Sequence, residues 1–398
     1  MNQSLHRVFH TLLSIIGNLP ILYLCFKVYD IDLLADFSKG ILLFQYLFLV
    51  NEWGFNLYAL QNINSKKIIN EKIINEIIFA KILLGFANLI FISFVFLLDV
   101  IVFNNPYMPF FLIFITFLSA LNPLWFFQAI GRIELLNLPL LLLKLSQILL
   151  LYLLIESWNV GLFFILQGFI FFSLFLYNLY KLKKFYKYKL EINYPNFLLG
   201  ISGINKMKAL FFSNLHNHLN LTLWGIVLIV ISSPIQIIIF NLVDTIYRGM
   251  NAIFQSIIEP IFRDININLK VLIYFFLFPT IIFIPIYYFM PFLTHTIFPK
   301  YSNELIEVFR LLSILLAILF ASKIFTYFSL GKENIAKMNK LNIQFLFFEI
   351  FLVVTWYLLM EINVKEIILL LLFLNLIKIS FLVLLKLFPK NAKSAQDN

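Results

Sequence analysis

The chain has 398 residues, of which 62% are hydrophobic and only 13% are charged, and its mean hydropathy is +0.94. A soluble domain of this length cannot bury so much apolar surface, so the composition excludes a soluble globular protein and predicts an all-α, polytopic membrane protein. The single cysteine, Cys25, leaves no disulfide framework and no thiolate metal site to expect.

Twelve segments are apolar and long enough to cross a bilayer, which takes about 20 residues. In chain order they are residues 9–28, 40–60, 76–99, 107–127, 138–156, 160–180, 208–232, 236–260, 270–290, 304–328, 341–360 and 365–386. No small-residue cleavage site follows the first segment, so we interpret it as a spanning helix and not as a signal peptide.

The longest predicted loop divides these segments into two sets of six. We therefore expect a six-helix N-terminal lobe, a basic cytoplasmic loop, a six-helix C-terminal lobe and a cytoplasmic tail, at residues 1–180, 181–207, 208–388 and 389–398. Two such lobes around a central cavity are common among transporters.

Lysine and arginine are concentrated in every second loop, and the loop 181–207 is the most basic. Basic loops stay in the cytoplasm, so this distribution predicts a multi-pass protein with both termini cytoplasmic. The net charge of +10 is then a matter of topology and of contact with lipid, and it does not indicate a nucleic-acid-binding patch.

Polar residues at helical spacing form a stripe along each of four predicted spans. The stripes are Thr11, Ser14 and Asn18 in the first span; Gln45, Glu52 and Asn56 in the second; Ser213, Asn217 and Asn220 in the seventh; and Asp244, Arg248, Asn251, Gln255 and Glu259 in the eighth. One interpretation is that each stripe joins helices by hydrogen bonds. The other is that the four stripes line a shared hydrophilic cleft, since polar groups in a membrane face a partner or a wet cavity.

Six basic residues lie within the predicted spans: Lys81, Lys144, Arg248, Arg310, Lys323 and Lys378. A charge in the middle of the membrane costs about 2.5–3.5 kcal/mol or more, so such residues mark either a substrate path or a local pair.

Local explanations exist for three of these six. Lys81 is near the cytoplasmic end of its span and can extend to the headgroups, Arg248 can pair with Asp244, and Arg310 can pair with Glu307. The other three, Lys144, Lys323 and Lys378, have no acidic residue three or four positions away, so we favour them for contact with an anionic substrate. Each of them can also pair with a residue of another helix.

The sequence contains no phosphate-binding glycine loop and no nucleophile with a base in a loop predicted to be outside. His216 and His218 are two residues apart, so they cannot share a helix face as a metal pair. We therefore expect a protein that is not an enzyme and that has no metal or cofactor.

One motif carries a resemblance to a known family. Residues 122–134 read Asn-Pro-Leu-Trp-Phe-Phe-Gln-Ala-Ile-Gly-Arg-Ile-Glu. This segment resembles the Pro-x-Trp-Phe-Phe-Gln-Gly-x-Glu motif of bacterial O-antigen flippases, with Ala129 and Gly131 where the family has Gly and Glu. The motif residues are Pro123, Trp125, Phe126, Phe127 and Gln128. Two interpretations of their role stay open: an aromatic anchor at the membrane interface, or a hinge at the cytoplasmic rim.

Three further positions of the N-terminal half are similar to the same family. They are the segment 45–57, the lysine Lys81 in the third span and the lysine Lys144 in the fifth. The C-terminal half resembles the family only in the number and character of its helices.

The resemblance implies a flippase of the multidrug/oligosaccharidyl-lipid/polysaccharide exporter superfamily in the bacterial inner membrane. Such a protein moves undecaprenyl-diphosphate-linked oligosaccharides by alternating access, for O-antigen or other surface polysaccharide. Its partners would be the polyprenyl-diphosphate glycan and membrane lipid, with a polysaccharide polymerase and glycosyltransferases beside it. Coupling to a proton or sodium gradient would use Glu52, Asp244 or Glu259.

Three alternatives stay open at this point. The first is an ion-coupled small-molecule efflux carrier of the same superfamily, for which we would expect acidic residues in the lumen. The second is a peptidoglycan-precursor flippase, which would have two further helices. The third is a membrane-embedded enzyme, for which we would expect a long outer loop or a clustered catalytic set.

Overall fold

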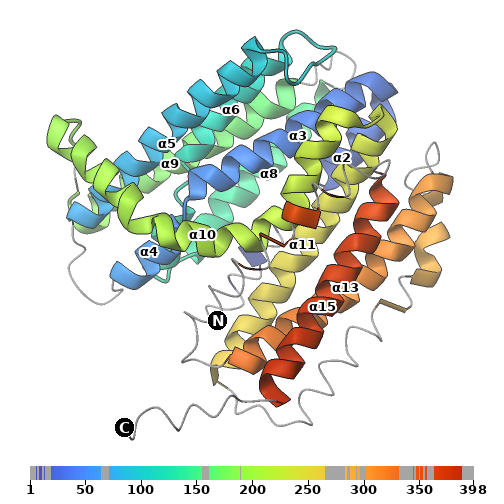
Figure 1. Cartoon of the computed structure of the whole chain (residues 1–398). Coiled ribbons are helices and arrows are strands. Elements are labelled where there is room, and N and C mark those ends of the chain that lie inside the picture. Colours follow the sequence, from blue (N-terminus) through green and yellow to red (C-terminus); the bar gives the residue numbers. More distant parts are fainter. Residues whose placement is uncertain are drawn as a thin grey trace, which may run out of the picture. The chain divides into compact units, whose positions relative to one another are not determined.

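The computed structural model describes residues 19–63, 71–154, 161–188, 190–264, 302–330 and 363–387, with isolated positions between 6 and 13, 283 and 295, and 344 and 355. Every regular element in this part of the chain is a helix (Figure 1). The chain forms two compact units, residues 1–241 and 242–398.

The first unit contains α2 (Leu19–Val28), α3 (Ile31–Glu52), α4 (Phe55–Asn62), α5 (Glu71–Leu97), α6 (Met108–Ala120), α7 (Leu124–Ala129), α8 (Glu134–Leu153), α9 (Gly161–Tyr186), α10 (Tyr194–Ile231) and the first turns of α11 (Pro234–Asp264). The second unit contains the rest of α11, α13 (Ser302–Leu330) and α15 (Val364–Leu387).

Within the described residues, seven helices are long and apolar enough to cross a membrane: Ile31–Glu52, Glu71–Leu97, Met108–Ala129, Glu134–Leu153, Gly161–Lys184, Pro234–Phe254 and Asn303–Ser322. Each overlaps a predicted span, so the all-α, multi-pass fold class is confirmed. The predicted spans 270–290 and 341–360 lie largely outside the described residues.

The predicted span 40–60 is wrong in two respects. Its helix begins nine residues earlier, at Ile31, because Asp30 caps it by accepting a hydrogen bond from the Leu33 amide at 2.9 Å. It also breaks at Trp53 and Gly54, whose φ angles of 32° and 78° are left-handed and end a helix.

A non-glycine residue such as Trp53 adopts a positive φ only when its surroundings hold it there. The Trp53 ring stacks on Phe211 of α10 with centroids 3.9 Å apart. Its indole N–H donates to the Ile204 carbonyl at 3.2 Å. The break between α3 and α4 is therefore fixed by contacts with α10.

The predicted span 107–127 is divided as well. Helix α6 ends at Ala120, and α7 begins at Leu124, directly after Pro123. Proline has no amide hydrogen and its ring interferes with the preceding turn, which accounts for the break.

The predicted loop 181–207 is largely helical. Helix α9 continues to Tyr186, and α10 begins at Tyr194, where the Asn193 side chain accepts a hydrogen bond from the Asn196 amide. Hydropathy missed this part of α10 because its apolar residues are mixed with Asn and Lys. The lobe limits themselves stay a prediction.

Helix α10 is fixed to α5 by close backbone contact. A Cβ on Gly200 would lie 2.8 Å from the Phe79 carbonyl carbon, and one on Gly203 would lie 2.9 Å from the Glu76 carbonyl oxygen. The second half of α10 packs on α3, where Gly225 faces Leu42. Figure 1 shows the first half of α10 crossing the bundle before the chain turns along α3.

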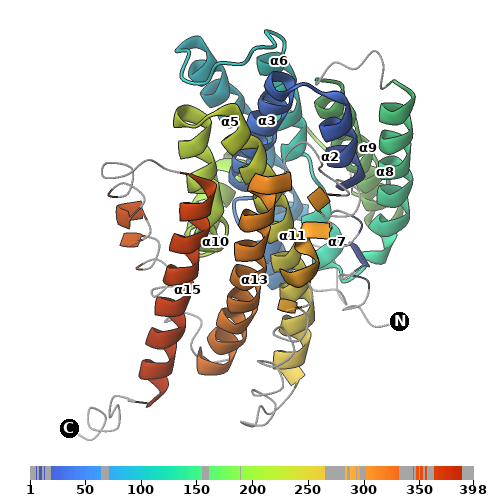
Figure 2. The same cartoon turned by 90° about the vertical axis from the view of Figure 1, so that its right-hand side faces the viewer.

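The apolar core of the first unit forms where α4, α5, α7 and α8 meet, and it includes Phe55, Ile77, Trp125, Phe126 and Leu136. Figure 2 shows α8 and α9 side by side in this unit.

In the second unit, α13 and α15 pack along each other (Figure 2). The Phe254 ring of α11 meets the Phe320 ring of α13 edge to face, with centroids 4.6 Å apart.

Candidate functional site

A buried polar cluster lies where α3 ends, between α5 and the α6–α7 turn. Asn51 is fully buried and donates to the Thr116 carbonyl and to the Ser119 hydroxyl, each at 2.8 Å. Asn88 of α5 donates to Asn51 Oδ1 at 2.7 Å and to the Leu47 carbonyl at 3.2 Å. These bonds join three predicted spans at one level, which is the role of helix-joining polar residues in membranes.

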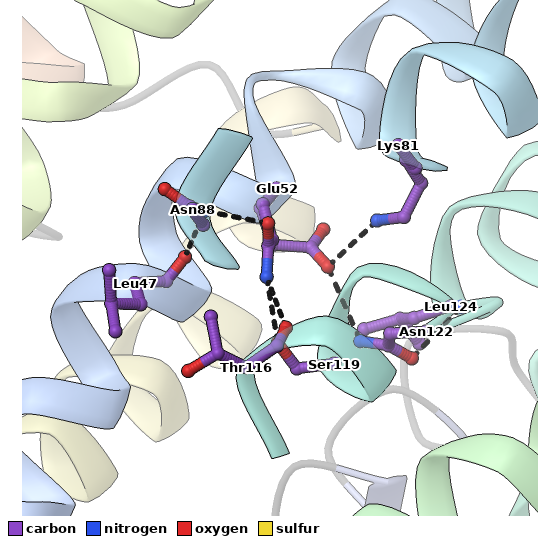
Figure 3. Close-up of polar contacts among 9 residues, drawn as sticks. Leu47, Glu52, Lys81, Asn88, Thr116, Ser119, Asn122 and Leu124 are labelled. Atoms are coloured by element: carbon purple, nitrogen blue, oxygen red, sulfur yellow. Dashed lines mark hydrogen bonds and ion pairs between the residues drawn. The ribbon is translucent and has the colours of Figure 1, made fainter. Parts of the chain in front are cut away.

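Beside this cluster, Glu52 and Lys81 form a buried ion pair (Figure 3). Lys81 Nζ lies 3.2 Å from Glu52 Oε1, and the Lys81 side chain is 3% exposed. The Asn122 amide donates to the same oxygen at 3.4 Å, and the Lys81 ammonium lies 5.2 Å from the centre of the Phe55 ring. The pair therefore brings α3, α5 and the α6–α7 turn together in the region of the helix break.

Sequence reasoning did not predict this pair, and it missed Asn51 and Asn88 as site residues. One signal was available: Lys81 and Asn88 are seven residues apart and so share one face of α5. The Glu52–Lys81 pair cancels the Lys81 charge, although extension of Lys81 to the headgroups was the alternative that we considered. The anion-contact role of Lys81 stays a prediction.

A small cavity adjoins Lys81. It is lined by Ile78, Lys81, Ala120, Leu121, Trp125, Phe175 and Asn178, and its volume is about 10 Å³. That is roughly what the centre of one water molecule needs. Asn178 is 1% exposed, and its Oδ1 has no hydrogen-bond partner in the described part of the chain. A cavity of this size holds a small polar species at most, so it is not the binding site of a sugar.

The aromatic residues of the family motif are core residues. Trp125, Phe126 and Phe127 are each 2% exposed or less, and Phe127 stacks on Tyr177 of α9 with ring centroids 6.1 Å apart. Aromatic anchors of the membrane interface would present their rings to the headgroups. The anchor interpretation is therefore wrong for these rings. Gln128 is half-buried and Arg132 is exposed just after the motif.

Lys144 lies at a second polar contact, between α8 and α9. It is 6% exposed, and its ammonium donates to Gln167 Oε1 at 2.7 Å and to Gln147 Oε1 at 3.3 Å. Both of these acceptors are side-chain amides, one on α8 and one on α9. The expectation that Lys144 can find a partner on another helix is met by Gln167.

The second unit contains another buried pair. Arg248 Nε donates to both carboxylate oxygens of Asp244, at 2.7 and 2.8 Å, and Asp244 is fully buried. This is the local pair within one helix that the sequence offered as an alternative to substrate contact. Asp244 and Arg248 thus hold each other in α11.

The sequence offered Glu307 as an ion-pair partner for Arg310, but Glu307 pairs with another residue. Glu307 instead accepts a hydrogen bond from Lys365 of α15 at 2.8 Å, on an exposed surface. The Arg310 guanidinium lies over the Tyr287 ring, 5.3 Å from its centre, and no described group accepts a hydrogen bond from its buried Nε. The anion-contact role of Arg310 stays a prediction.

The remaining two cations lie in helices of the second unit. Lys378 lies in α15, whereas the side chain of Lys323 in α13 lies outside the described part of the chain. Their contact with an anion stays a prediction.

The polar stripes are only partly described. Gln45, Asn56 and Asn251 each have a buried side-chain oxygen without a hydrogen-bond partner among the described residues. Asn18 and the side chains of Asn217, Asn220 and Gln255 lie outside the described part. Within that same part, no group of three or more His, Cys, Asp or Glu side chains has the arrangement of a metal site.

Comparison with known proteins identifies solved structures with a similar fold. No protein-family model and no curated protein sequence matches the chain. Solved structures do match, over 97% of this chain and 94% of their own chains. They include a MATE protein in complex with MaL6 (TM-score 0.58, 11% identity), a MOP superfamily transporter from Pyrococcus furiosus (0.54, 13%) and a multidrug resistance MATE family transporter in an outward-facing conformation (0.54, 12%).

The chain therefore has the fold of MATE transporters, which have about 12 membrane-spanning helices, the number predicted from the sequence. At 11–13% identity, this likeness concerns the fold.

Proposed function

We propose that this multi-pass helical protein with a MATE transporter fold translocates lipid-linked oligosaccharides whose diphosphate it contacts with membrane-embedded cations. The observation that carries the proposal is the environment of Lys144, which is buried in α8 and donates to two neutral amides at 2.7 and 3.3 Å. A lysine ammonium buried at this depth lies in a medium of low dielectric, where a cation attracts an anion strongly.

Arg310 supports the same conclusion from the second unit. Its guanidinium lies over the Tyr287 ring, and the nearby Glu307, on which the Arg310 charge also acts, accepts a hydrogen bond from Lys365. An aromatic ring stabilises a cation without cancelling its charge. Lys81 and Arg248 contribute less to the proposal, because each is paired with a carboxylate.

The motif at residues 122–134 favours this class of substrate through its resemblance to O-antigen flippases. A related observation concerns the Pyrococcus furiosus protein of the same fold, whose binding pocket has a reversed polarity that suggests a different function. In that protein, the polarity of the binding pocket is thus linked to function.

A second candidate function is efflux of small molecules. It is favoured by the solved multidrug resistance MATE transporter, which shares the fold. The carboxylates Glu52 and Asp244 would then bind a proton or sodium ion, or a cationic substrate. Both are engaged by basic residues in the structure, which favours a role in coupling over a role in binding an organic cation.

The two candidates separate in a deletion experiment in the protein's own host. For the flippase, we expect loss of surface polysaccharide, with polyprenyl-linked repeat units left on the cytoplasmic face. Unchanged polysaccharide together with raised sensitivity to cationic drugs would instead establish the efflux carrier.

Complementation of the deletion strain with Lys144→Ala then tests the role of the buried lysine. We expect polysaccharide output to fall about tenfold or more, since loss of one charge-assisted contact of about 1.5–3 kcal/mol has this effect. Lys144→Arg keeps the charge and should retain most of the output, and Lys27→Ala, which removes an exposed lysine, should retain all of it. Full output from Lys144→Ala at equal protein level would contradict the proposal.

A further inference from the structure

The first half of α10 has an unusual distribution of exposed residues. Its buried positions are 196, 200, 203 and 207, which form one continuous helix face against α5. The opposite face carries Tyr194, Leu198 and Ile201, at spacings of four and three, which are 74%, 49% and 50% exposed. An amphipathic helix on a water-exposed surface turns polar residues outward, whereas this face begins with three exposed apolar residues and continues with the exposed Asn205 and Lys208.

Helix α10 is longer than a spanning helix needs to be. The 38 residues of α10 would extend about 57 Å if straight, at 1.5 Å per residue, whereas the hydrocarbon core is about 30 Å thick. The second half is the apolar part and ends in the run 223–231, while the first half carries Lys206 and Lys208. The first half therefore lies outside the hydrocarbon core.

The orientation of the outward face is set by several anchors to α5. Lys206 Nζ lies 2.6 Å from Glu76 Oε1, and the Asn75 amide donates to Asn196 Oδ1 at 3.2 Å. The hydroxyl of Tyr58 donates to the other Glu76 oxygen at 2.8 Å. This bond joins α4 to α5 and positions the Glu76 carboxylate that Lys206 of α10 contacts.

Positive charge lies next to this face in the chain. Lys183 and Lys184 in the last turn of α9 and Lys187 just after it are exposed. The Lys184 ammonium lies 5.8 Å from the centre of the Tyr180 ring, which is itself 55% exposed. Aromatic and apolar side chains beside several lysines are the composition of helices that lie in the membrane interface.

We infer that Tyr194, Leu198 and Ile201 of α10, together with Lys183, Lys184 and Lys187, form a binding surface for anionic phospholipid headgroups of the cytoplasmic leaflet. The apolar stripe enters the boundary between headgroups and acyl chains, and the lysines contact the phosphates. The same surface would hold α10 in place against the bilayer while Trp53 connects α10 to the break between α3 and α4.

The test uses the full chain with Cys25→Ser and a nitroxide label at Leu198→Cys. The protein is placed in nanodiscs of phosphatidylcholine alone or of phosphatidylcholine with increasing phosphatidylglycerol, at low salt. Collision of the label with oxygen and with a water-soluble nickel chelate reports its depth. A label at the exposed Asn62 of α4 serves as a matched control for a helix face without an apolar stripe.

We expect phosphatidylglycerol to move the label at 198 away from the nickel chelate and toward oxygen. In Lys183→Gln/Lys184→Gln/Lys187→Gln the apparent affinity for this lipid should fall by roughly fivefold per lysine. The corresponding triple Lys→Arg variant should behave as the parent. In high salt, phosphatidylglycerol should move the label at 198 less, because exposed charges are screened.

Three outcomes would overturn the inference. A label at 198 that stays in water at every lipid composition would exclude a membrane contact. A label that is deep in phosphatidylcholine alone and insensitive to the lysine variants would exclude headgroup recognition. A label that is immobilised only at high protein concentration would assign the surface to a second copy of the chain. None of these results depends on the substrate that is transported.

Discussion

At the residue scale, the Glu52–Lys81 ion pair is the contact whose disruption by one substitution should reduce stability most. Both side chains are held inside the first unit, with Lys81 3% and Glu52 17% exposed. Two charges in such a place are tolerable only together, because the attraction between them offsets the loss of hydration. A variant that removes one partner leaves the other charge uncompensated.

We predict that Glu52→Gln and Lys81→Met each destabilise the protein by about 3–5 kcal/mol. The double variant Glu52→Gln/Lys81→Met should recover a large part of this loss, because no isolated charge remains. The midpoint of thermal unfolding of the purified protein measures both effects. Losses that simply add in the double variant would show that the two residues do not interact.

The exposed pair Glu307–Lys365 provides the matched control. Lys365 Nζ lies 2.8 Å from Glu307 Oε2, yet both side chains are more than half exposed. Water and salt screen such a pair, so Glu307→Gln should leave the unfolding midpoint almost unchanged. A large shift in this control would mean that exposure does not decide the strength of ion pairs in this protein.

At the scale of elements, α10 is distinguished by its glycine contacts with α5. A Cβ on Gly200 would lie 2.8 Å from the Phe79 carbonyl carbon and 2.9 Å from the Ala80 amide nitrogen. Both are backbone atoms of a helix, so they cannot turn aside as a flexible side chain can. The glycine is needed for the close approach of two helices, as small residues are in membrane proteins generally.

We predict that Gly200→Ala separates the first half of α10 from α5, at a cost of about 1–3 kcal/mol of overpacking. Amide hydrogen exchange over residues 194–208 should then become roughly tenfold faster or more. Ser202→Ala, two residues along the same helix, should leave the exchange unchanged. Unchanged exchange in Gly200→Ala would show that the two helices have room to adjust.

At the scale of the whole molecule, the basic loops predict a topology. By the positive-inside pattern, we expect residue 187 in the cytoplasm and residue 104 outside. Both positions are exposed. In a Cys25→Ser background, we predict that Asn104→Cys reacts with a membrane-impermeant maleimide in intact cells, and that Lys187→Cys reacts only after permeabilisation. The opposite labelling would reverse the topology.

Much of the helical framework follows from the sequence alone. Predicted spans such as 76–99, 138–156 and 304–328 coincide closely with α5, α8 and α13. A window of about 20 apolar residues is a local property, and the thickness of the bilayer makes that property sufficient. The breaks at Trp53 and before Leu124 divide apolar segments that hydropathy treats as continuous.

The pairing of polar residues was decided only by the tertiary structure. Glu52 meets Lys81 at a separation of 29 residues, Asn51 meets Ser119 at 68, and Lys144 meets Gln167 at 23. Such pairs depend on how each helix is rotated about its own axis, and packing against neighbouring helices sets that rotation. The sequence by itself thus determined that the chain is helical and crosses a membrane many times, and it located several of the spans. Which charges are cancelled, and which are held by neutral groups, was a matter of helix packing.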